Sequence, residues 1–284
     1  MPPVRFDNGL SALVSSEPWE PIAEGLGFVE GPVWLPDGSL LFSDTLNDRM
    51  HVWRDGALSV HRENAGGPNG MTLDLDMRIV GCEQDGRRVF RERDGVVEPI
   101  ATHYEGRRLN SPNDIVVRSD GRIFFTDPPY GVTDATRELP YNGVFTIATD
   151  GVMRLLATDF EKPNGLAFSP DERTLYIADT ARCQVRAFDV ALDGALSNGR
   201  IFAGMREEGR PDGMKVDRDG RVYVCAFTVQ VFAADGTPLG VIDCPQLPAN
   251  CTWGGDGSTL FITARTAVYR TRVASTGIAP YLSV

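Results

Sequence analysis

The sequence predicts an all-β protein folded as a six-bladed β-propeller with four-stranded antiparallel blades. Three observations predict this fold: a pattern that recurs every 40 to 50 residues or so, short strand-like runs bounded by turn residues, and almost no helical periodicity. Each copy has a turn containing Pro or Gly, a short apolar run, a polar turn of the Asp-Gly type, and a second run rich in Val, Ile, Phe and Tyr. The 30 glycines and 19 prolines in 284 residues supply the many turns that such a chain needs.

Six copies of the pattern set the number of blades, because propellers are built from 4 to 8 blades of about this length. The copies begin at Glu30 (EGPVWLPDGSLLFSD), Pro68 (PNGMTLDLDMRIVGC), Pro112 (PNDIVVRSDGRIFFTD), Pro163 (PNGLAFSPDERTLYIAD), Pro211 (PDGMKVDRDGRVYVCA) and, more weakly, Pro248 (PANCTWGGDGSTLFITA). The segment before the first copy is expected to supply an N-terminal strand to the last blade, which closes the ring into one domain over residues 1–284. A β-sandwich would fit the strands but not their period.

One position stays in register through the copies and carries an oxygen-bearing side chain in five of them. Because the start of each blade's inner strand faces the channel, these side chains are expected to surround one axis. The sixth copy offers Ala249, or Asn250 if a one-residue bulge is allowed. The five residues are Glu30, Asn69, Asn113, Asn164 and Asp212.

Two of these residues, Glu30 and Asp212, are acidic, and two close carboxylates repel each other unless a cation lies between them. A set made only of carboxylate and amide oxygens suits hard ions such as Ca²⁺ or Mg²⁺ better than Zn²⁺. The alternative is that Asn-Gly and Asp-Gly are ordinary turn dipeptides, selected for backbone geometry alone. Five copies in register favour a metal site.

Composition and missing motifs exclude several function classes. A net charge of −11 disfavours nucleic acid, and neither a signal peptide nor a membrane-spanning stretch is visible, so a cytoplasmic location is expected. The five cysteines lack a CxxC pair and are read as reduced thiols. GxSxG and HExxH are absent. The three histidines have no ligand-spaced partners, and only His103 is kept as a pocket candidate.

From about Gly27 onward the chain resembles the SMP-30/gluconolactonase/LRE-like family, and looks closest to its bacterial gluconolactonase branch. The motifs that carry the resemblance are EGPVW (Glu30–Trp34), RLNSPND (Arg108–Asp114), FTDPPYG (Phe125–Gly131), KPNGLAFSPD (Lys162–Asp171) and RPDGMKVD (Arg210–Asp217). The resemblance implies a six-bladed propeller that holds one divalent metal ion in its channel, most simply Ca²⁺, with Mg²⁺, Mn²⁺ and Zn²⁺ as alternatives.

Carried over by motif, the family's metal ligands are Glu30, Asn113, Asn164 and Asp212, which leaves Asn69 beside the site on the substrate or a bound water. Asn113 is expected to contact the substrate as well. The chain departs from the family at two places: Ser111 stands where animal members have Arg, and CEQDG carries Gln84 where bacterial relatives often have His.

The implied activity is hydrolysis of a sugar lactone, with Asp212 orienting or deprotonating the attacking water. Asp127 and Tyr130 are predicted substrate contacts, with turn packing as the alternative for Tyr130, whereas Asp114 and Asp217 are equally compatible with turn-holding roles. Two other functions are left open: hydrolysis of aryl lactones or organophosphate triesters at the same metal, and a calcium-binding propeller without chemistry. The expected partner is a small lactone, with no nucleic acid or membrane, and the chain is expected as a monomer or weak homo-oligomer.

Overall fold

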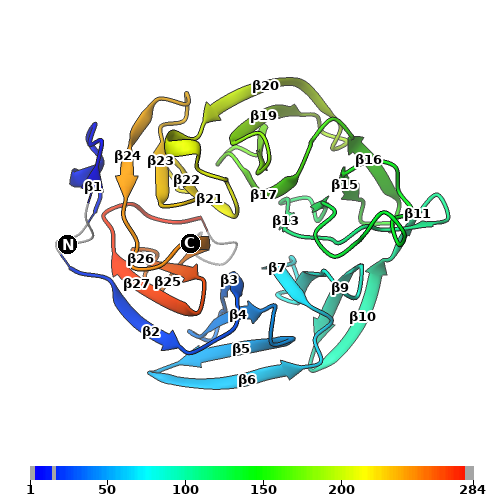
Figure 1. The fold of residues 1–284 in the computed structure, drawn as a ribbon, viewed down its shortest axis with the longest axis horizontal. Coiled ribbons are helices and arrows are strands. Elements are labelled where there is room, and N and C mark those ends of the chain that lie inside the picture. The colour runs from blue at the N-terminus through cyan, green and yellow to red at the C-terminus, as the bar shows by residue number, and fades with distance from the viewer. Residues whose placement is uncertain (1–3, 15–16, 279–284) are drawn as a thin grey trace.

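The computed structural model describes residues 4–14 and 17–278, and in these residues the chain forms six antiparallel sheets around one axis (Figure 1). The innermost strand of each blade lies next to the inner strands of its neighbours, so the starts of all six meet around the channel. Blade by blade from the axis outward, the strands are β3 (Val29–Trp34), β4 (Leu40–Asp44), β5 (Arg49–Arg54) and β6 (Ala57–Glu63); β7 (Pro68–Leu73), β8 (Ile79–Glu83), β9 (Arg88–Arg93) and β10 (Val96–Ala101); β13 (Ile115–Val117), β14 (Ile123–Asp127), β15 (Gly143–Ile147) and β16 (Met153–Ala157). Blades 4 to 6 contain β17 (Pro163–Phe168), β18 (Thr174–Asp179), β19 (Gln184–Val190) and β20 (Leu196–Gly204); β21 (Met214–Val216), β22 (Val222–Cys225), β23 (Val229–Phe232) and β24 (Pro238–Ile242); β25 (Pro248–Gly254), β26 (Thr259–Ala264) and β27 (Ala267–Arg272).

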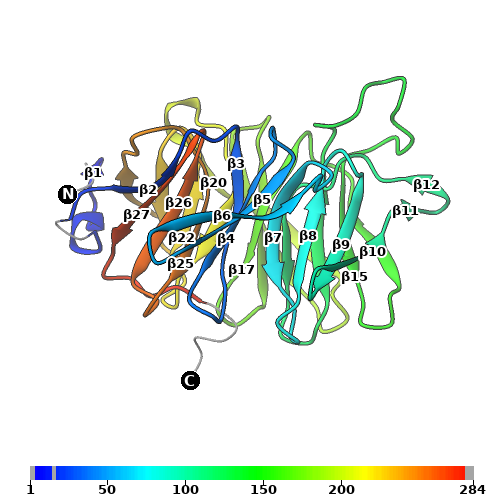
Figure 2. The same cartoon turned by 90° about the horizontal axis from the view of Figure 1, so that it is seen from below.

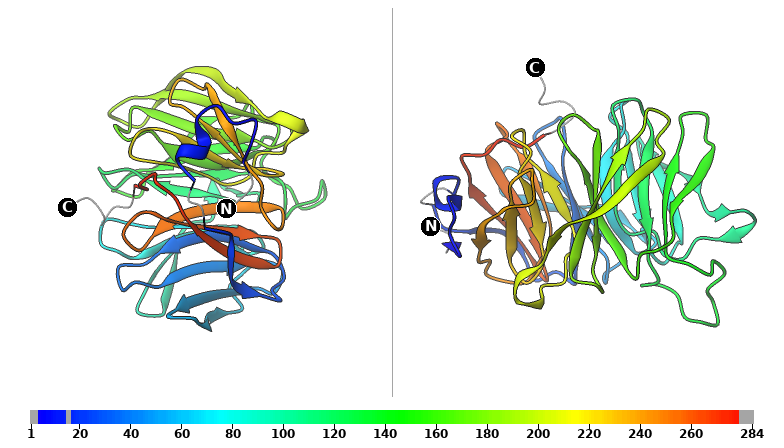
Figure 3. Two further views of the ribbon diagram at one scale, coloured as in Figure 1. Left: turned by 90° about the vertical axis from the view of Figure 1, so that its left-hand side faces the viewer. Right: turned by 90° about the horizontal axis from the view of Figure 1, so that it is seen from above.

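The predicted closure by an N-terminal strand is confirmed. Strand β2 (Glu20–Glu24) pairs antiparallel with β27 as the outermost strand of blade 6, and Glu20 lies opposite Arg270 in the register. The two ends of the ring are therefore held in one sheet. A second N-terminal strand, β1 (Val4–Arg5), adds a fifth strand to blade 5 by pairing with β24, which the sequence pattern did not predict. Figure 3 shows both N-terminal strands on the outer surface of the ring.

The core lies between the blades, where the strands of adjacent sheets face each other. At the closure, Trp34 of blade 1 stacks on Phe261 of blade 6 with 5.2 Å between ring centroids, and Trp53 meets the same ring. A buried aromatic side chain contributes about 1.5–3 kcal/mol through the hydrophobic effect. Packing of this kind between blades 6 and 1 supplements the backbone pairing of β2.

Helix is nearly absent over the described residues, as the sequence predicts, and consists of two 3₁₀ turns, Leu10–Ala12 and Arg206–Glu208. No helix among these residues combines the length and apolar character needed to cross a membrane. Between blades 2 and 3 a small hairpin, β11 (His103–Tyr104) and β12 (Arg107–Arg108), projects from the rim (Figure 2). His103 belongs to this exposed hairpin and bonds to Thr102.

Candidate metal centre and active site

The residues in register begin the inner strands and form a ring at one end of the channel. Hydrogen bonds between neighbouring blades tie this ring together, because the amide of the residue after one ring position donates to the carbonyl of the next ring position. These bonds are Gly70 N to Asn113 O (2.8 Å), Gly165 N to Asp212 O (3.1 Å) and Gly213 N to Ala249 O (2.7 Å).

Glycine follows the ring position in four blades because the backbones approach too closely for a side chain. A Cβ at Gly31 would lie 2.1 Å from the Asn69 carbonyl oxygen, and one at Gly165 would lie 2.2 Å from the Asp212 carbonyl oxygen. Gly31 also has a φ of +50°, a region that favours glycine. The Asn-Gly and Asp-Gly pairs therefore do serve the backbone, as the turn interpretation required, but their backbone role also places the preceding polar side chains around one axis.

Glu30 is 3% exposed, and both hydrogen bonds that its carboxylate accepts fall on Oε2: one from the Gly31 amide (2.6 Å) and one from Asn250 Nδ2 (3.0 Å). Burial raises the pKa of Glu30 well above its usual range, and the negative charges of Asp212 and Asp114 raise it further. Burial raises the pKa of Asp212 to about 7, which Asp114 reinforces and a hydrogen bond with Asn164 opposes. The ring thus holds buried carboxylates with too little positive charge to balance them.

Asn164 lies on the same side of the ring as a hydroxyl pair. Its Nδ2 donates to the Tyr130 hydroxyl (3.1 Å) and to Thr180 Oγ1 (3.2 Å), and the Tyr130 hydroxyl donates to Thr180 Oγ1 (3.3 Å). Tyr130 is 37% exposed, and burial of its hydroxyl followed by the charge of Asp212 raises its pKa. The structure therefore brings Tyr130 to the ring. Sequence reasoning missed Thr180, whose only signal is its place directly after the Asp that ends β18.

The other two amide residues of the ring come from blades 2 and 3, and their side chains have no partner among the described residues. Asn69 and Asn113 are each 6% exposed. Neither side-chain amide makes a hydrogen bond with any residue that the structure describes. These two amides are therefore available to bind a ligand.

In the sixth blade, Ala249 and Asn250 share what one residue does in the other blades: Ala249 takes the backbone position and Asn250 supplies the side chain. The Ala249 carbonyl accepts the Gly213 amide, as the carbonyls of Asn113 and Asp212 accept theirs, so Ala249 occupies the ring position. The pairing register of β25 shifts between Pro248 and Asn250, and the side chain of Asn250 contacts Glu30. The sixth copy therefore gives the ring a methyl group and, one residue later, an amide.

Asp127, the last residue of β14, is not one of the ring residues. It is fully buried at the end of β14, and its Oδ2 accepts the Asn110 amide at 2.8 Å. Burial raises its pKa to about 7. Aspartates at the same place in two other blades also accept amides two or three residues before a ring position: Asp44 bonds Gly27 and Phe28, and Asp179 bonds Glu161 and Lys162. Asp127 bonds the loop before its ring position in the same way as these two aspartates, so its surroundings point to a role in positioning the loop before Asn113.

Asp114 and Lys215 also reach the channel; the sequence left Asp114 between a turn-holding and a chemical role and did not single out Lys215. Asp114 is 3% exposed; its Oδ1 accepts the Ile115 amide at 2.9 Å, and its Oδ2 has no partner among the described residues. Burial raises the pKa of Asp114, and the nearby Lys215 ammonium opposes that shift. Asp217, by contrast, is buried away from the ring and bonds the Arg221 amide in a turn.

This donor set fits a hard divalent cation. It combines the buried carboxylate of Glu30 and the half-buried carboxylate of Asp212 with amide oxygens, and Asp114 adds a third carboxylate with an unpartnered oxygen. No cluster of three or more His, Cys, Asp or Glu side chains arranged to hold a metal occurs in residues 4–14 and 17–278, so a site here depends on the asparagines. None of the five cysteines forms a disulfide, and the described His51 and His61 contact Asp44 and Glu92 away from the ring.

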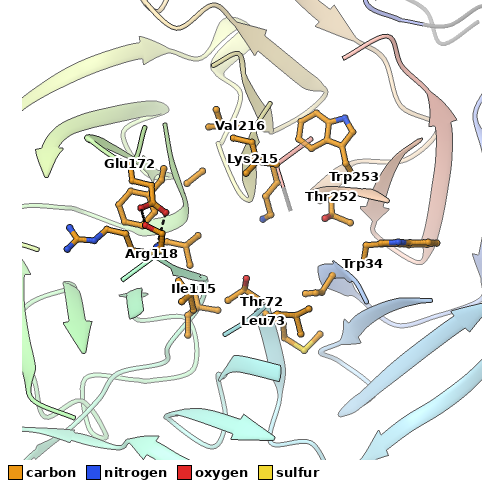
Figure 4. A pocket seen from close by; sticks show the side chains of 18 of the residues that line it. Trp34, Thr72, Leu73, Ile115, Arg118, Glu172, Lys215, Val216, Thr252 and Trp253 are labelled. Carbon is orange, nitrogen blue, oxygen red and sulfur yellow. Dashed lines mark hydrogen bonds between the residues drawn. The ribbon is translucent and has the colours of Figure 1, made fainter. Parts of the chain in front are cut away.

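At the far end of the same inner strands lies a cavity of about 360 Å³. Its lining comes from positions about two to four residues beyond the ring, including Trp34, Leu73, Ile115, Val216 and Trp253, which surround the axis in Figure 4. Lys215 lines this cavity and also reaches toward the ring, because its Nζ donates to Asn250. We call this cavity the lower chamber.

Comparison with known proteins places the chain in a family. The SMP-30/gluconolactonase/LRE-like region matches residues 28–266. The gluconolactonase of Zymomonas mobilis is 35% identical, with 96% of this chain and 86% of that protein aligned, and the pentonolactonase XacC of Haloferax volcanii is 30% identical, with 82% and 80% aligned. The structure of XC5397 from Xanthomonas campestris, described as a gluconolactonase, superposes with a TM-score of 0.90 at 35% identity and covers 96% of this chain and 95% of that one. The chain belongs to the SMP-30/gluconolactonase/LRE-like family, as its motifs predict.

Proposed function

We propose that the chain is a hydrolase that opens a sugar lactone and that it depends on one divalent metal ion. The observation that carries the proposal is the ring: the buried carboxylate of Glu30, the half-buried carboxylate of Asp212 and the unpartnered amides of Asn69 and Asn113 at one end of a channel, in a chain whose relatives include a gluconolactonase and a pentonolactonase. Glu30, Asn113, Asn164 and Asp212 would hold the ion. Ca²⁺ suits this set of oxygen donors best.

A divalent ion bound by these residues would supply polarisation of the lactone carbonyl. The chain's own contribution is to bind the substrate and to manage the proton. Burial raises the pKa of Asp212 to about 7 in the metal-free chain. A bound cation would lower that pKa, so Asp212 would be ionised near neutral pH and able to accept a proton from water. Tyr130, a partly exposed residue, brings its hydroxyl to Asn164 on the same side of the ring. We assign it and the amides of Asn69 and Asn113 to the substrate.

The decisive experiment is a pH-indicator assay over a panel of sugar lactones, aryl lactones and one phosphotriester. It is run on the protein as purified, after exhaustive chelation, and after addition of Ca²⁺, Mg²⁺, Mn²⁺ or Zn²⁺. We expect hydrolysis of an aldonolactone that disappears on chelation and returns with one of these ions. Turnover of the phosphotriester alone would assign the other hydrolase function, and tight metal binding without any turnover would assign a binding protein.

The Asp212→Asn variant tests the role of Asp212 in the same assay, with the metal ion added to saturation because Asp212 is also a proposed metal ligand. General acid–base catalysis contributes roughly 10²- to 10⁴-fold, so we expect kcat to fall by about that much while the variant remains folded. The matched control is Asp217→Asn, because Asp217 is a buried aspartate of the same blade that bonds only within its turn. Full activity in Asp212→Asn would remove Asp212 from the mechanism.

A further inference from the structure

Lys215 connects the lower chamber to the metal ring. It lies on β21, three residues after Asp212, and Figure 4 shows its side chain extending toward the axis. Its Nζ donates to Asn250 Oδ1 at 3.3 Å and to the Met214 carbonyl at 3.2 Å. In the other direction, Asn250 Nδ2 donates to Glu30 Oε2 at 3.0 Å. These contacts form a relay from an ammonium group through one amide to a proposed metal ligand.

The relay has a fixed direction. Asn250 Oδ1 accepts from Lys215 and also from the Cys251 amide at 2.9 Å, so two donors hold the oxygen of this amide on the side away from Glu30. The NH₂ group must then face the carboxylate. If the amide rotated by 180°, its oxygen would meet the Glu30 carboxylate and both groups would lose their partners, which is costly in a buried site.

The positive charge of Lys215 has a second effect on the ring, which opposes metal binding. The ring region contains the carboxylates of Glu30, Asp114 and Asp212, and Lys215 is the cation that acts on Asp114. A positive charge near a metal site repels the metal, because like charges a few ångströms apart interact strongly in a buried environment. Removing the ammonium therefore weakens cation binding if its orienting effect dominates, and strengthens it if its charge dominates.

We propose that Lys215 is a positioning residue for Glu30: through Asn250 it holds the carboxylate with Oε2 bonded to the protein and Oε1 left for the metal. The inference rests on the proposed metal site. Partners of this kind that orient a metal ligand typically change metal affinity by about 10- to 100-fold when removed. Lys215 is one of only two lysines in the chain, so the position has an ammonium group where basic residues are otherwise nearly all arginine.

The test is a double-mutant cycle on metal affinity, measured by calorimetric titration of the chelated full-length chain with Ca²⁺, or with Mg²⁺ or Mn²⁺ if the wild type prefers one of them. Lys215→Met removes the ammonium and keeps an apolar stem against the lower chamber. Asn250→Ala removes the relay and keeps the ammonium. We expect each variant to bind the metal about 10- to 100-fold more weakly, and the double variant to bind no more weakly than Asn250→Ala, because Lys215 acts through Asn250.

Arg118→Met is the matched control, since Arg118 is a cation that lines the same chamber but bonds the carbonyls of Ala191 and Leu192 instead of the ring. It should leave metal affinity unchanged. Tighter or unchanged binding by Lys215→Met, or additive losses in the double variant, would overturn the proposal while the metal site stands. Circular dichroism melts identify any variant that fails to fold, and in that case Asn250→Ala alone still decides between loss and retention of affinity. A wild-type chain that binds none of these ions would overturn both the metal site and the relay.

Discussion

The two ends of the six inner strands differ in nearly every physical respect, although only a few residues separate them. At the ring end, carboxylates and amides are buried with few partners, and glycines let the backbones touch. At the lower chamber, the same strands present Trp34, Leu73 and Trp253 to an apolar cavity. The ring end works against stability, since buried charge without compensation is unfavourable, and the lower end supports it.

The difference teaches that function and packing are separated along each strand rather than between blades. Polar groups held in an unfavourable setting are typical of a binding site, because a ligand then supplies the missing interactions. Apolar residues that only fill space contribute to stability through their volume. Substituting them is therefore expected to lower the stability and to leave the binding site unchanged. Four substitutions test this separation.

Glu30→Gln should have the largest effect. The neutral amide still accepts the Gly31 hydrogen bond but supplies no charge to a cation, so metal affinity should fall by more than about 100-fold and lactone hydrolysis with it. The melting temperature of the metal-free protein should not decrease, because the variant removes a buried carboxyl group whose charge is uncompensated. Calorimetric titration and a melting curve measure the two parts. Glu24→Gln, on an exposed position of β2, is the control. A metal-free protein that unfolds much earlier would contradict the comparison.

Gly165→Ala should be the most destabilising change at the ring end. The new Cβ would lie 2.2 Å from the Asp212 carbonyl oxygen and 2.7 Å from Gly213 Cα, so the two blades must move apart. Overpacking of this kind typically costs about 1–3 kcal/mol, and backbone contacts this short put the expected loss at the upper end. Urea unfolding measures it. Gly204→Ala is the control, because a Cβ at Gly204 meets nothing within 4 Å; equal effects of the two variants would refute the close-approach explanation.

Leu73→Ala tests the other end of the strand that begins at the Asn69 position. Leu73 is 3% exposed and packs with Val33, Met71 and Phe90 between blades 1 and 2. Truncation of a buried Leu costs about 2–5 kcal/mol, and the open chamber beside it should keep the loss near the lower limit. Metal affinity and kcat of the folded variant should stay at wild-type values. A change in metal affinity comparable to that of Glu30→Gln would show that the two ends are coupled.

Much of this architecture could be predicted from the sequence because the repeat constrains it strongly. Alternating runs and turn residues give the strands, and their period gives the blades. The register of Glu30, Asn113, Asn164 and Asp212 then follows, since equivalent residues of a closed ring share one axis. The last copy supplies only three strands to its blade, so the segment before the first copy was needed for the fourth, which made the closure predictable.

The rest depends on distances across the channel, which no single copy encodes. Asp114 and Asn250 stand one residue beyond the ring position, in opposite blades, where four other copies have glycine, and only their approach to Glu30 and Lys215 gives them significance. Asp127 was predicted as a substrate contact from its motif. The FTD motif could not reveal that the carboxylate of Asp127 accepts the Asn110 amide in the loop before Asn113.

Asp127→Asn should have the smallest effect, and its sign depends on pH. Burial raises the pKa of Asp127 from 3.8 to about 7, against the opposing influence of the Asn110 and Ser111 amides and of the Arg87 charge. The folded protein therefore binds a proton that the unfolded chain releases between about pH 4 and 7, so the contribution of the protonated carboxyl to stability is lost as the pH rises through this window. Asparagine keeps an acceptor for the Asn110 amide and has no charge to bury at any pH. The unfolding free energy of Asp127→Asn should thus increase relative to that of the wild type from pH 5 to pH 8, by an amount on the order of a kcal/mol or a few.

Urea denaturation of both proteins at the two pH values measures this increase, with Asp150→Asn as the control, since the exposed Asp150 accepts the Val152 amide in a turn. An unchanged difference between the two proteins from pH 5 to pH 8 would mean that the carboxyl of Asp127 is already ionised at pH 5 in the folded protein, and that the loop amides hold it as an ion in spite of its burial.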